Sequence, residues 1–533
     1  MYYSPDFVKS VLVNHSDFQE KLYVRGYLIS EDSYDLTKYP FYANWEKKSL
    51  GKLKTFIYHH KKTNCYIYED ENTVYFLIGH AYDPYDMIFS EDDILRSLAK
   101  KMLISEDMFW EKSGDLTGVY TFGYINNNKL CFSTDSVGMS MTYYGIVNSK
   151  IIISSHSKIV ADLYGLEQDP YIVKLVNSRF YRFFGMWLPG DLSPFAELKR
   201  LLPNFCGYYS DGKIITKRYF PKSPIIEITS EEEYYQKLDE IDRILQNSLF
   251  LISKKWSGKR AALSLTGGKD STTTLSCAKD VYQSLGYFSY VSVEKERPDA
   301  EAAKIISDRL GLEHHVYYIP ENDSEIANID IHRMILECNA GCIGKNNDND
   351  VRKRAFFSET NDFDVEIKSW VGELSRAEAQ NKYNTLQWPA KPSAGYFRCM
   401  WKVIVSPTLI LESNRVFREY LRLYYSEEVL SYLPWMDYFF WEFSWPAGEG
   451  LFLTSEHKYA YDVTIPYCNR HLLKTMFETP FAKRLKSKIQ TDTIHFLEPR
   501  IEAAGQSVKN VTHTKLWEDI IRIYLHVFSV LNF

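Results

Sequence analysis

The segment that most constrains the fold of this chain is residues 261–274, which read Ala-Ala-Leu-Ser-Leu-Thr-Gly-Gly-Lys-Asp-Ser-Thr-Thr-Thr. A short apolar stretch with strand character leads into two glycines, and Asp270 and a row of hydroxyl side chains then open a helix. Glycines let the backbone come close to a ligand, and N–H groups at a helix N-terminus attract anions. The pattern therefore predicts a loop that binds a chain of phosphates, with Asp270 placed to hold Mg²⁺ on them. The residues assigned to this loop are Thr266, Gly267, Gly268, Asp270, Ser271 and Thr272.

The alternative is an ordinary strand-to-helix turn with a glycine pair, and the residues that follow argue against it. Residues 287–293 form a β-branched and aromatic run, a helix start follows at Pro298, and residues 316–319 read as another strand. Strands that alternate with helices predict a parallel sheet with right-handed crossovers. A nucleotide then belongs at the carboxyl ends of the strands, where we expect Leu265 and Val293 to frame adenine.

The length of 533 residues predicts two or three domains, and a net charge of −6 argues against a broad nucleic-acid surface. The net charge still allows a local basic patch at residues 483–488. Eight cysteines are scattered without a CxxC pair, so we expect reduced thiols and a cytoplasmic protein. Residues 1–6 do not read as a signal peptide, and the aromatic stretch 435–443 is too short and too charged to cross a bilayer.

The first 220 residues read as short strands with a few helices, which predicts packed β-sheets. Two hairpins are expected, one turning at residues 126–128 and one at Asn148-Ser149. Two prolines in residues 218–224 mark a boundary, and a long helix begins near Ser230. We therefore divide the chain into residues 1–222 and 225–533, and expect mostly helix after residue 330.

Several segments resemble the asparagine synthetase superfamily in their order and spacing. The loop resembles the Ser-Gly-Gly-x-Asp-Ser motif of the N-type ATP pyrophosphatases, with Thr266 at the first position. Residues 114–122 resemble the family's Gly-Asp-Phe-Ala-Phe strand, and residues 134–144 resemble its Arg-Asp-x-x-Gly…Tyr-Tyr segment. Residues 154–158 stand where the family has Ser-Glu-x-Lys, and residues 461–470 resemble its Glu-x-Arg-x-Pro-Phe-Leu-Asp segment.

The resemblance implies an α+β sandwich of the N-terminal-nucleophile-hydrolase type (αββα), a glutaminase-like domain. An α/β parallel-sheet ATP-pyrophosphatase domain with extra C-terminal helices would follow it. Glutamine-hydrolysing members use an N-terminal cysteine, whose thiolate is the nucleophile. This chain has Tyr2 at that position and no cysteine before Cys65, so glutaminase chemistry is expected to be absent. In this respect the chain looks like β-lactam synthetases and lasso-peptide cyclases.

A second departure lies in residues 369–376, the nearest counterpart of the family's Ser-Gly-Glu-Gly-x-Asp-Glu motif. Gly372 and Glu373 match it, whereas Arg376 replaces the later aspartate. The guanidinium can bind phosphate or a substrate carboxylate, and the metal would then rest on Asp270 and Glu373. The alternative is a surface Glu–Arg pair.

Relatives commonly use a lysine from the C-terminal region in the transition state, and Lys488 is the candidate here, with Lys486 second. The alternative for both lysines is solvated surface charge. His314 and His315 are read as structural, because adjacent strand residues point to opposite faces. The small-residue segment 338–344 is a candidate for substrate contact.

The resemblance implies an ATP-dependent, AMP-forming carbon–nitrogen ligase that adenylates a carboxylate and passes it to an amine or ammonia. ATP and Mg²⁺ are the expected cofactors, with Lys488, Glu373 and Arg376 as catalytic candidates. The expected substrates are an amine donor and a small-molecule or peptide acid from natural-product or glycan biosynthesis. The resemblance also allows a homodimer or a complex with a biosynthetic partner enzyme. Alternatives are an intramolecular isopeptide synthetase, a thiolation enzyme, or a non-catalytic nucleotide-binding scaffold.

Overall fold

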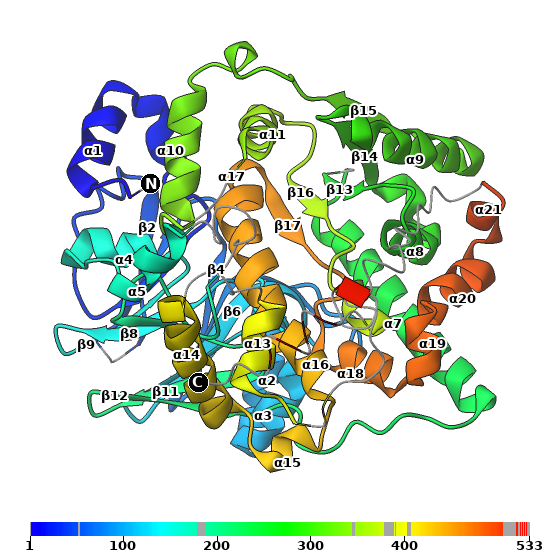
Figure 1. The fold of residues 1–533 in the computed structure, drawn as a ribbon, viewed down its shortest axis with the longest axis horizontal. Helices are drawn as coiled ribbons and strands as arrows, with labels where there is room; N and C mark the ends of the chain where they lie inside the picture. Colours follow the sequence, from blue (N-terminus) through cyan, green and yellow to red (C-terminus); the bar gives the residue numbers. More distant parts are fainter. Residues whose placement is uncertain are drawn as a thin grey trace.

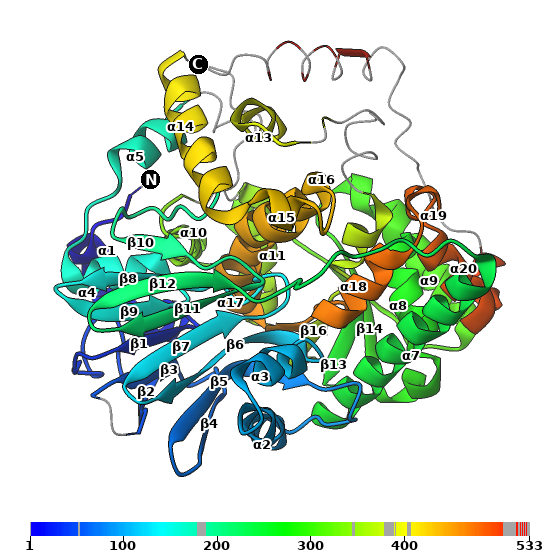
Figure 2. The same ribbon diagram turned by 90° about the horizontal axis from the view of Figure 1, so that it is seen from below.

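A computed structural model describes residues 2–504 apart from 52–53, 179–187, 259, 344–346, 378–388, 390 and 402–406, together with a few positions from 519 to 529. Within these residues the strands form three sheets, two antiparallel and one parallel. The antiparallel sheets come from the N-terminal part of the chain and the parallel sheet from the remainder (Figures 1 and 2).

The first antiparallel sheet has the strand order β10-β8-β9-β1-β3-β2. These strands are β10 (Leu198–Arg200), β8 (Tyr143–Val147), β9 (Lys150–Ser154), β1 (Tyr27–Ser30), β3 (Phe56–His60) and β2 (Trp45–Ser49). The second sheet has the order β12-β11-β7-β6-β5-β4. These strands are β12 (Lys213–Arg218), β11 (Phe205–Ser210), β7 (Lys129–Thr134), β6 (Thr117–Asn126), β5 (Thr73–Tyr82) and β4 (Cys65–Glu69).

The two antiparallel sheets pack against each other, and the Tyr27 hydroxyl on β1 lies 2.9 Å from the Thr121 hydroxyl on β6. Helix α2 lies against the second sheet, and α4 lies near β9 of the first (Figure 2). The helices of this part are α1 (Pro5–Asn14), α2 (Glu91–Met102), α3 (Glu106–Ser113), α4 (Ser157–Tyr164) and α5 (Pro170–Val176). Packed β-sheets are therefore present as predicted, while the finer N-terminal-nucleophile class stays a prediction.

Both predicted hairpins are confirmed, and their turns explain them. Asn127 and Asn128 join β6 to β7 with φ of 46° and 62°, and Asn148 and Ser149 join β8 to β9 with φ of 51° and 63°. Two-residue hairpin loops of this kind need positive φ at both positions, which asparagine tolerates better than most residues. Strand β1 is short, because only Tyr27–Ser30 pairs with neighbouring strands.

The long helix predicted near Ser230 is α7 (Glu231–Lys255). Its N-cap is Ser230, whose hydroxyl accepts from the Glu233 amide while the Glu233 carboxylate accepts from the Ser230 amide. This reciprocal capping satisfies backbone donors that the first turn would otherwise leave open. The helix leads into the parallel sheet, whose first strand begins at Ala261.

The parallel sheet has the order β15-β14-β13-β16-β17. Its strands are β13 (Ala261–Ser264), β14 (Gly286–Val291), β15 (His315–Tyr318), β16 (Val365–Ile367) and β17 (Asp462–Thr464). The predicted parallel sheet is thus confirmed. The expectation of mostly helix after residue 330 missed β16 and β17, because each spans three residues and carries too little pattern to recognise.

The helices of this part surround the parallel sheet and extend over the antiparallel ones (Figure 1). Near the sheet are α8 (Lys269–Cys277), α9 (Arg297–Leu310), α10 (Ile329–Asn339) and α11 (Asp348–Ser358). Later in the chain come α13 (Ala394–Met400), α14 (Pro407–Tyr424), α15 (Glu427–Leu430), α16 (Trp435–Tyr438) and α17 (Lys458–Ala460). The last group is α18 (Arg470–Glu478), α19 (Phe481–Leu485), α20 (Lys488–Leu497) and α21 (Pro499–Glu502).

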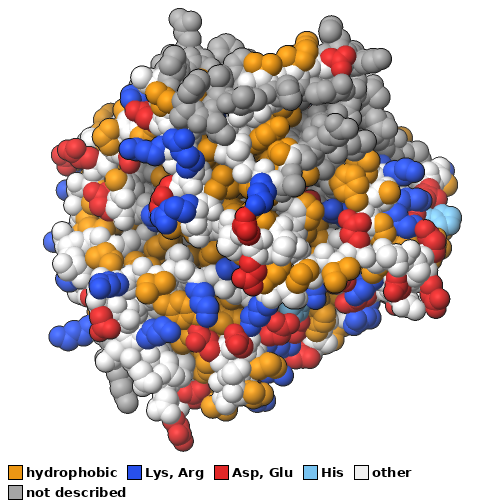
Figure 3. Space-filling view, turned by 60° about the horizontal axis from the view of Figure 1, so that its bottom comes forward, with side chains coloured by type: hydrophobic (Ala, Val, Ile, Leu, Met, Phe, Trp, Pro, Cys, Tyr) orange, Lys and Arg blue, Asp and Glu red, His pale blue; other side chains and the backbone are white. Residues whose placement is uncertain are grey.

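The aromatic stretch that begins at Trp435 is a buried helical segment between the two parts of the chain. From Phe439 to His457 it contains three π-helical stretches, and its Trp441 indole donates to the Ser136 carbonyl at 2.7 Å. In the part of the chain that the structure describes, no helix has the length and apolar character to cross a membrane. Figure 3 shows charged side chains of both signs interspersed over one face of the molecule.

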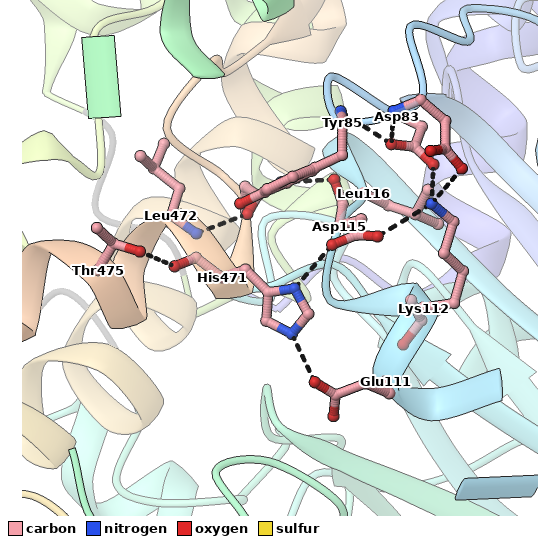
Figure 4. A network of polar contacts seen from close by, with 12 residues as sticks. Asp83, Tyr85, Glu111, Lys112, Asp115, Leu116, His471, Leu472 and Thr475 are labelled. Carbon is pink, nitrogen blue, oxygen red and sulfur yellow. Dashed lines mark hydrogen bonds and ion pairs between the residues drawn. The ribbon is translucent and has the colours of Figure 1, made fainter. Parts of the chain in front are cut away.

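A polar network joins the two parts on the N-terminal side of α18 (Figure 4). His471 Nδ1 lies 2.8 Å from Asp115 Oδ1, and His471 Nε2 lies 3.4 Å from the Glu111 carboxylate. The Lys112 ammonium lies 3.0 Å from Asp115 and 2.6 Å from the buried Asp83. These contacts hold α18 against α3 and β6, and one buried apolar cluster contains side chains of all three sheets.

Candidate active site

A cavity of about 340 Å³ lies at the carboxyl ends of three neighbouring strands, β14, β13 and β16. Leu265 and Thr266 follow β13, Ser289 and Tyr290 lie near the end of β14, and Lys368 to Trp370 follow β16. This is the edge at which open parallel sheets place their ligands. The sequence predicted this location.

The predicted phosphate loop, residues 266–272, forms one wall of the cavity and is held by its own hydroxyl groups. The Thr266 hydroxyl accepts from the Gly268 amide at 3.1 Å and lies 3.0 Å from the Ser271 hydroxyl, which donates to the Thr266 carbonyl. The Thr272 hydroxyl donates to the Gly268 carbonyl at 2.9 Å. Gly268 is the N-cap of α8 and has no side chain to cap it, so the first N–H groups of that helix can receive an anion.

Asp270 lies in the first turn of α8 and lines the cavity. One carboxylate oxygen, Oδ2, lies 3.1 Å from the Arg376 guanidinium, and the other, Oδ1, is buried without a hydrogen-bond partner among the described residues. Burial raises the pKa of Asp270, and the positive charge of Arg376 opposes that rise. An orphaned buried carboxylate oxygen needs a cation or a donor, so Asp270 fits a role as ligand of one Mg²⁺.

The predicted residues Gly372, Glu373 and Arg376 belong to one short 3-10 helix, Gly372–Arg376. Glu373 lines the same cavity as Asp270. The Gly372 carbonyl accepts from the Gln490 amide at 3.3 Å, and that amide also donates to the Ser375 hydroxyl at 3.0 Å. The loop and this segment are therefore brought together, although their metal-binding and catalytic roles stay predictions.

Lys368 is the functional candidate that the sequence reading missed. It follows β16, is 6% exposed, and is the only basic side chain among the described residues that line the cavity. Its ammonium lies 2.8 Å from Glu366 and 4.6 Å from the centre of the Trp370 ring. Burial lowers the pKa of Lys368, and the Glu366 carboxylate opposes the change. A lysine directly after a buried strand is a signal that would have been visible if β16 had been recognised.

A buried charged layer lies behind Lys368. His457 Nδ1 lies 3.6 Å from Glu366, and the Arg354 guanidinium lies 2.9 Å from His457 Nε2. The His457 ring also packs edge-on against Trp370 at 5.0 Å. Burial and the neighbouring Arg354 charge hold the pKa of His457 well below its ordinary value. These contacts fix Glu366 and Trp370, and through them the position of the Lys368 ammonium.

Of the two residues expected to frame adenine, one lines the cavity and the other does not. Leu265 lines the cavity, and its amide donates to the Phe288 carbonyl at 2.8 Å. Val293 lies beyond the end of β14 and is not among the residues that line the cavity, where Ser289 and Tyr290 represent this strand. The Ser289 hydroxyl donates to the Leu265 carbonyl at 2.7 Å and lies 2.9 Å from His314 Nε2.

The His314 contact agrees with a structural reading of the histidine pair, since the exposed His315 ring instead packs on Tyr317 at 4.2 Å. Lys488 begins α20, is 45% exposed and pairs with Asp492 at 2.9 Å, while Lys486 is exposed. Neither lysine lines the cavity. No cluster of three or more His, Cys, Asp or Glu side chains suited to a metal occurs among the described residues.

The cysteines are buried and free, as predicted, and Cys338 lies in a core cluster with α1 and α4. The segment that contains it approaches Ser157 and Pro194 at Gly341 and does not line the cavity. Its last residue, Gly344, lies outside the described residues, and its proposed substrate contact stays a prediction.

The structure has a parallel sheet with a Gly-Gly-Lys-Asp-Ser loop at its carboxyl edge. Residues 256–338, which contain that loop, match the model of the family described as Asparagine synthase. The match covers less than half of the chain, so it shows similarity to that family over residues 256–338. A search of curated proteins finds no significant match.

Three solved structures show distant similarity. The allosteric regulatory enzyme of purine biosynthesis is 11% identical, with coverage of 65% of this chain and 92% of that chain and a TM-score of 0.25. Glutamine phosphoribosylpyrophosphate amidotransferase from B. subtilis is 11% identical, with coverage of 69% and 74% and a TM-score of 0.23. Glutamine-dependent NAD⁺ synthetase from Acinetobacter baumannii is 14% identical, with coverage of 47% and 46% and a TM-score of 0.19. At such TM-scores these similarities say nothing about the chemistry of this chain.

Proposed function

We propose that this protein is an ATP-dependent ligase that adenylates a substrate carboxylate, releases pyrophosphate, and passes the acyl group to an amine or ammonia with release of AMP. The observation that carries the proposal is the cavity at the carboxyl ends of β14, β13 and β16, with a phosphate loop in its wall. The family match over residues 256–338 supports the same class of reaction.

The loop supplies the groups that a departing pyrophosphate needs. Backbone N–H groups at Gly268 and the start of α8, with the hydroxyls of Thr266 and Ser271, can bind the β- and γ-phosphates. When bound, Mg²⁺ on Asp270 Oδ1 and the phosphates would neutralise part of the charge on the leaving group. Glu373 is the second predicted ligand and lines the same cavity.

The remaining wall suits the reacting carboxylate. Among the described residues, four acidic side chains line the cavity, namely Asp270, Glu296, Asp299 and Glu373, against the single ammonium of Lys368. A carboxylate or an α-phosphate that enters this cavity therefore finds its counter-charge at Lys368, and the Trp370 ring shields that contact from water. In this arrangement Lys368 holds the anionic group.

The amine donor is proposed to be the substrate itself or free ammonia. Tyr2 stands where glutamine-hydrolysing relatives have a cysteine, and the first cysteine along the chain, Cys65, is buried on β4. A buried thiol that is only 5% exposed is a poor nucleophile for glutamine. We therefore propose that the N-terminal part serves as a structural partner of the ligase.

The test is release of pyrophosphate and AMP from ATP by the full chain with a panel of carboxylic acids, each with ammonia or an amine. We expect equal amounts of AMP and pyrophosphate, and a loss of at least about 100-fold in Asp270→Asn, because the charge that binds the metal is removed. Asp364→Asn is the matched control, since Asp364 also pairs with an arginine but at the amino end of β16. ATP binding without pyrophosphate release for any acid would favour a nucleotide-binding scaffold instead.

A further inference from the structure

The segment that follows β16 has strained backbone on both sides of Glu373 and Arg376. Val371 has φ of 79° and Ala377 has φ of 50°, both in the left-handed region. A β-branched residue is rare in this region, and such residues cost of order 1–3 kcal/mol each. Strain of this kind persists only where surrounding contacts impose it, and it gathers at functional sites.

The surrounding contacts are specific. Val371 and Ala377 are both fully buried, and Tyr467 packs against the Cα of Gly372 so closely that a Cβ there would lie 3.3 Å from its ring. Gln490 on α20 holds the segment from the other side through the Gly372 carbonyl and the Ser375 hydroxyl. The fold therefore fixes this turn in an unfavourable conformation at both of its ends.

The strained turn places a cation at the phosphate loop. The Arg376 guanidinium lies 3.1 Å from Asp270 Oδ2, and the two side chains are 27% and 21% exposed. An acidic residue at position 376 would face Asp270 with like charge, and two such carboxylates need a metal ion between them. Arg376 instead places a positive charge beside Asp270 Oδ2.

We propose that Arg376 is a fixed cation of the phosphate loop, so that this chain binds pyrophosphate and the triphosphate of ATP with only a weak requirement for Mg²⁺. The inference rests on the proposed function, because it concerns the same loop. A guanidinium has five N–H donors, so it can bind a carboxylate and a phosphate together, and it carries its charge at every physiological pH. Asp270, the partner of Arg376, lines the cavity, so the Arg376 charge lies where the phosphates are proposed to bind.

The experiment measures binding rather than turnover. Pyrophosphate and ATP are titrated into the full chain by calorimetry, in excess Mg²⁺ and in excess EDTA. We expect the wild-type affinity in EDTA to stay within about tenfold of that in Mg²⁺. Arg376→Gln should lose at least about tenfold in EDTA and much less in Mg²⁺, because one charge-assisted phosphate contact is removed. Arg376→Asp should bind only in Mg²⁺, and Arg376→Lys should keep most of the binding in EDTA.

Arg260→Gln is the matched control, because Arg260 pairs with Asp364 at the opposite end of the same sheet. It should bind as the wild type does in both conditions, and circular dichroism should show every variant folded. Wild-type binding that is lost in EDTA, with no further change in Arg376→Gln, would overturn the inference and leave the proposed function standing. Absence of ATP and pyrophosphate binding in both conditions would overturn both.

Discussion

At the scale of single residues, the site depends on a few charges that oppose one another in a small volume. Lys368 is held by Glu366 at 2.8 Å and by the Trp370 ring, and Asp270 is held by Arg376 at 3.1 Å. Lys368 and Asp270 line the cavity, and each pairs with a side chain of opposite charge. The charge presented to a ligand is therefore set by both members of each pair.

Lys368 and Lys488 are the two candidates for the cation that binds the reacting anion, and substitution of each distinguishes between them. Lys368→Met should lower the rate of pyrophosphate formation at least about tenfold, because the buried ammonium that faces the ligand is lost. Lys488→Met should change the rate by less than about twofold, because that ammonium is half exposed and pairs with Asp492. The measurement is the steady-state rate at saturating ATP.

Lys368→Met leaves the Glu366 carboxylate buried without its lysine, which can destabilise the fold. A second variant therefore separates a loss of rate from a loss of folding. Lys368→Met combined with Glu366→Gln removes both charges and should show the same loss of rate with a wild-type melting temperature. A larger loss in Lys488→Met than in Lys368→Met would instead establish the C-terminal lysine as the catalytic one.

At the scale of helices and strands, the sequence predicts those features that are determined by the preferences of a few neighbouring residues. The loop at residues 266–272, the Ser230 cap and the Asn127-Asn128 turn follow from glycine, capping and positive-φ preferences over a few residues. The strands β16 and β17 form by pairing with strands distant in the sequence. Each spans only three residues, which is too few to show a periodic pattern of apolar residues. Lys368 follows β16, so it was missed together with that strand.

The positive φ angles of Val371 and Ala377 could not be predicted from the sequence, because distant segments impose them. Neither residue type favours positive φ, so no local preference predicts the turn. The contacts of Gln490 and Tyr467 that impose it come from segments about 100 residues later in the chain. The match of Glu373 to its motif could be found from sequence, but the position of Arg376 beside Asp270 could not.

At the scale of the whole molecule, α18 is tied to the N-terminal part by a charged histidine (Figure 4). Although burial lowers the pKa of His471, contacts with Asp115 and Glu111 outweigh it and raise the pKa to about 9. Because the folded state binds this proton more tightly than the unfolded chain does, the resulting stability is complete below about pH 6.5. That stability is lost as the pH rises through about 9.

His471→Gln should therefore lower the free energy of unfolding by about 2 kcal/mol at pH 6 and by almost nothing at pH 10. Urea unfolding of both proteins at the two pH values gives this difference. His495→Gln is the control, because His495 pairs with Glu502 on an exposed surface and should change stability by less than about 0.5 kcal/mol at either pH. An equal loss for His471→Gln at both pH values would show that the side chain acts through packing alone.

The proposed function depends on the binding of ATP phosphates at residues 266–272. The most direct measurement is a crystal structure of the full chain with α,β-methylene-ATP, whose bridging carbon prevents release of pyrophosphate. The account predicts the β- and γ-phosphates on the backbone N–H groups at Gly268 and the start of α8, with adenine beside Leu265 and the α-phosphate toward Lys368. An analogue bound elsewhere, with the cavity at the ends of β14, β13 and β16 left empty, would contradict it.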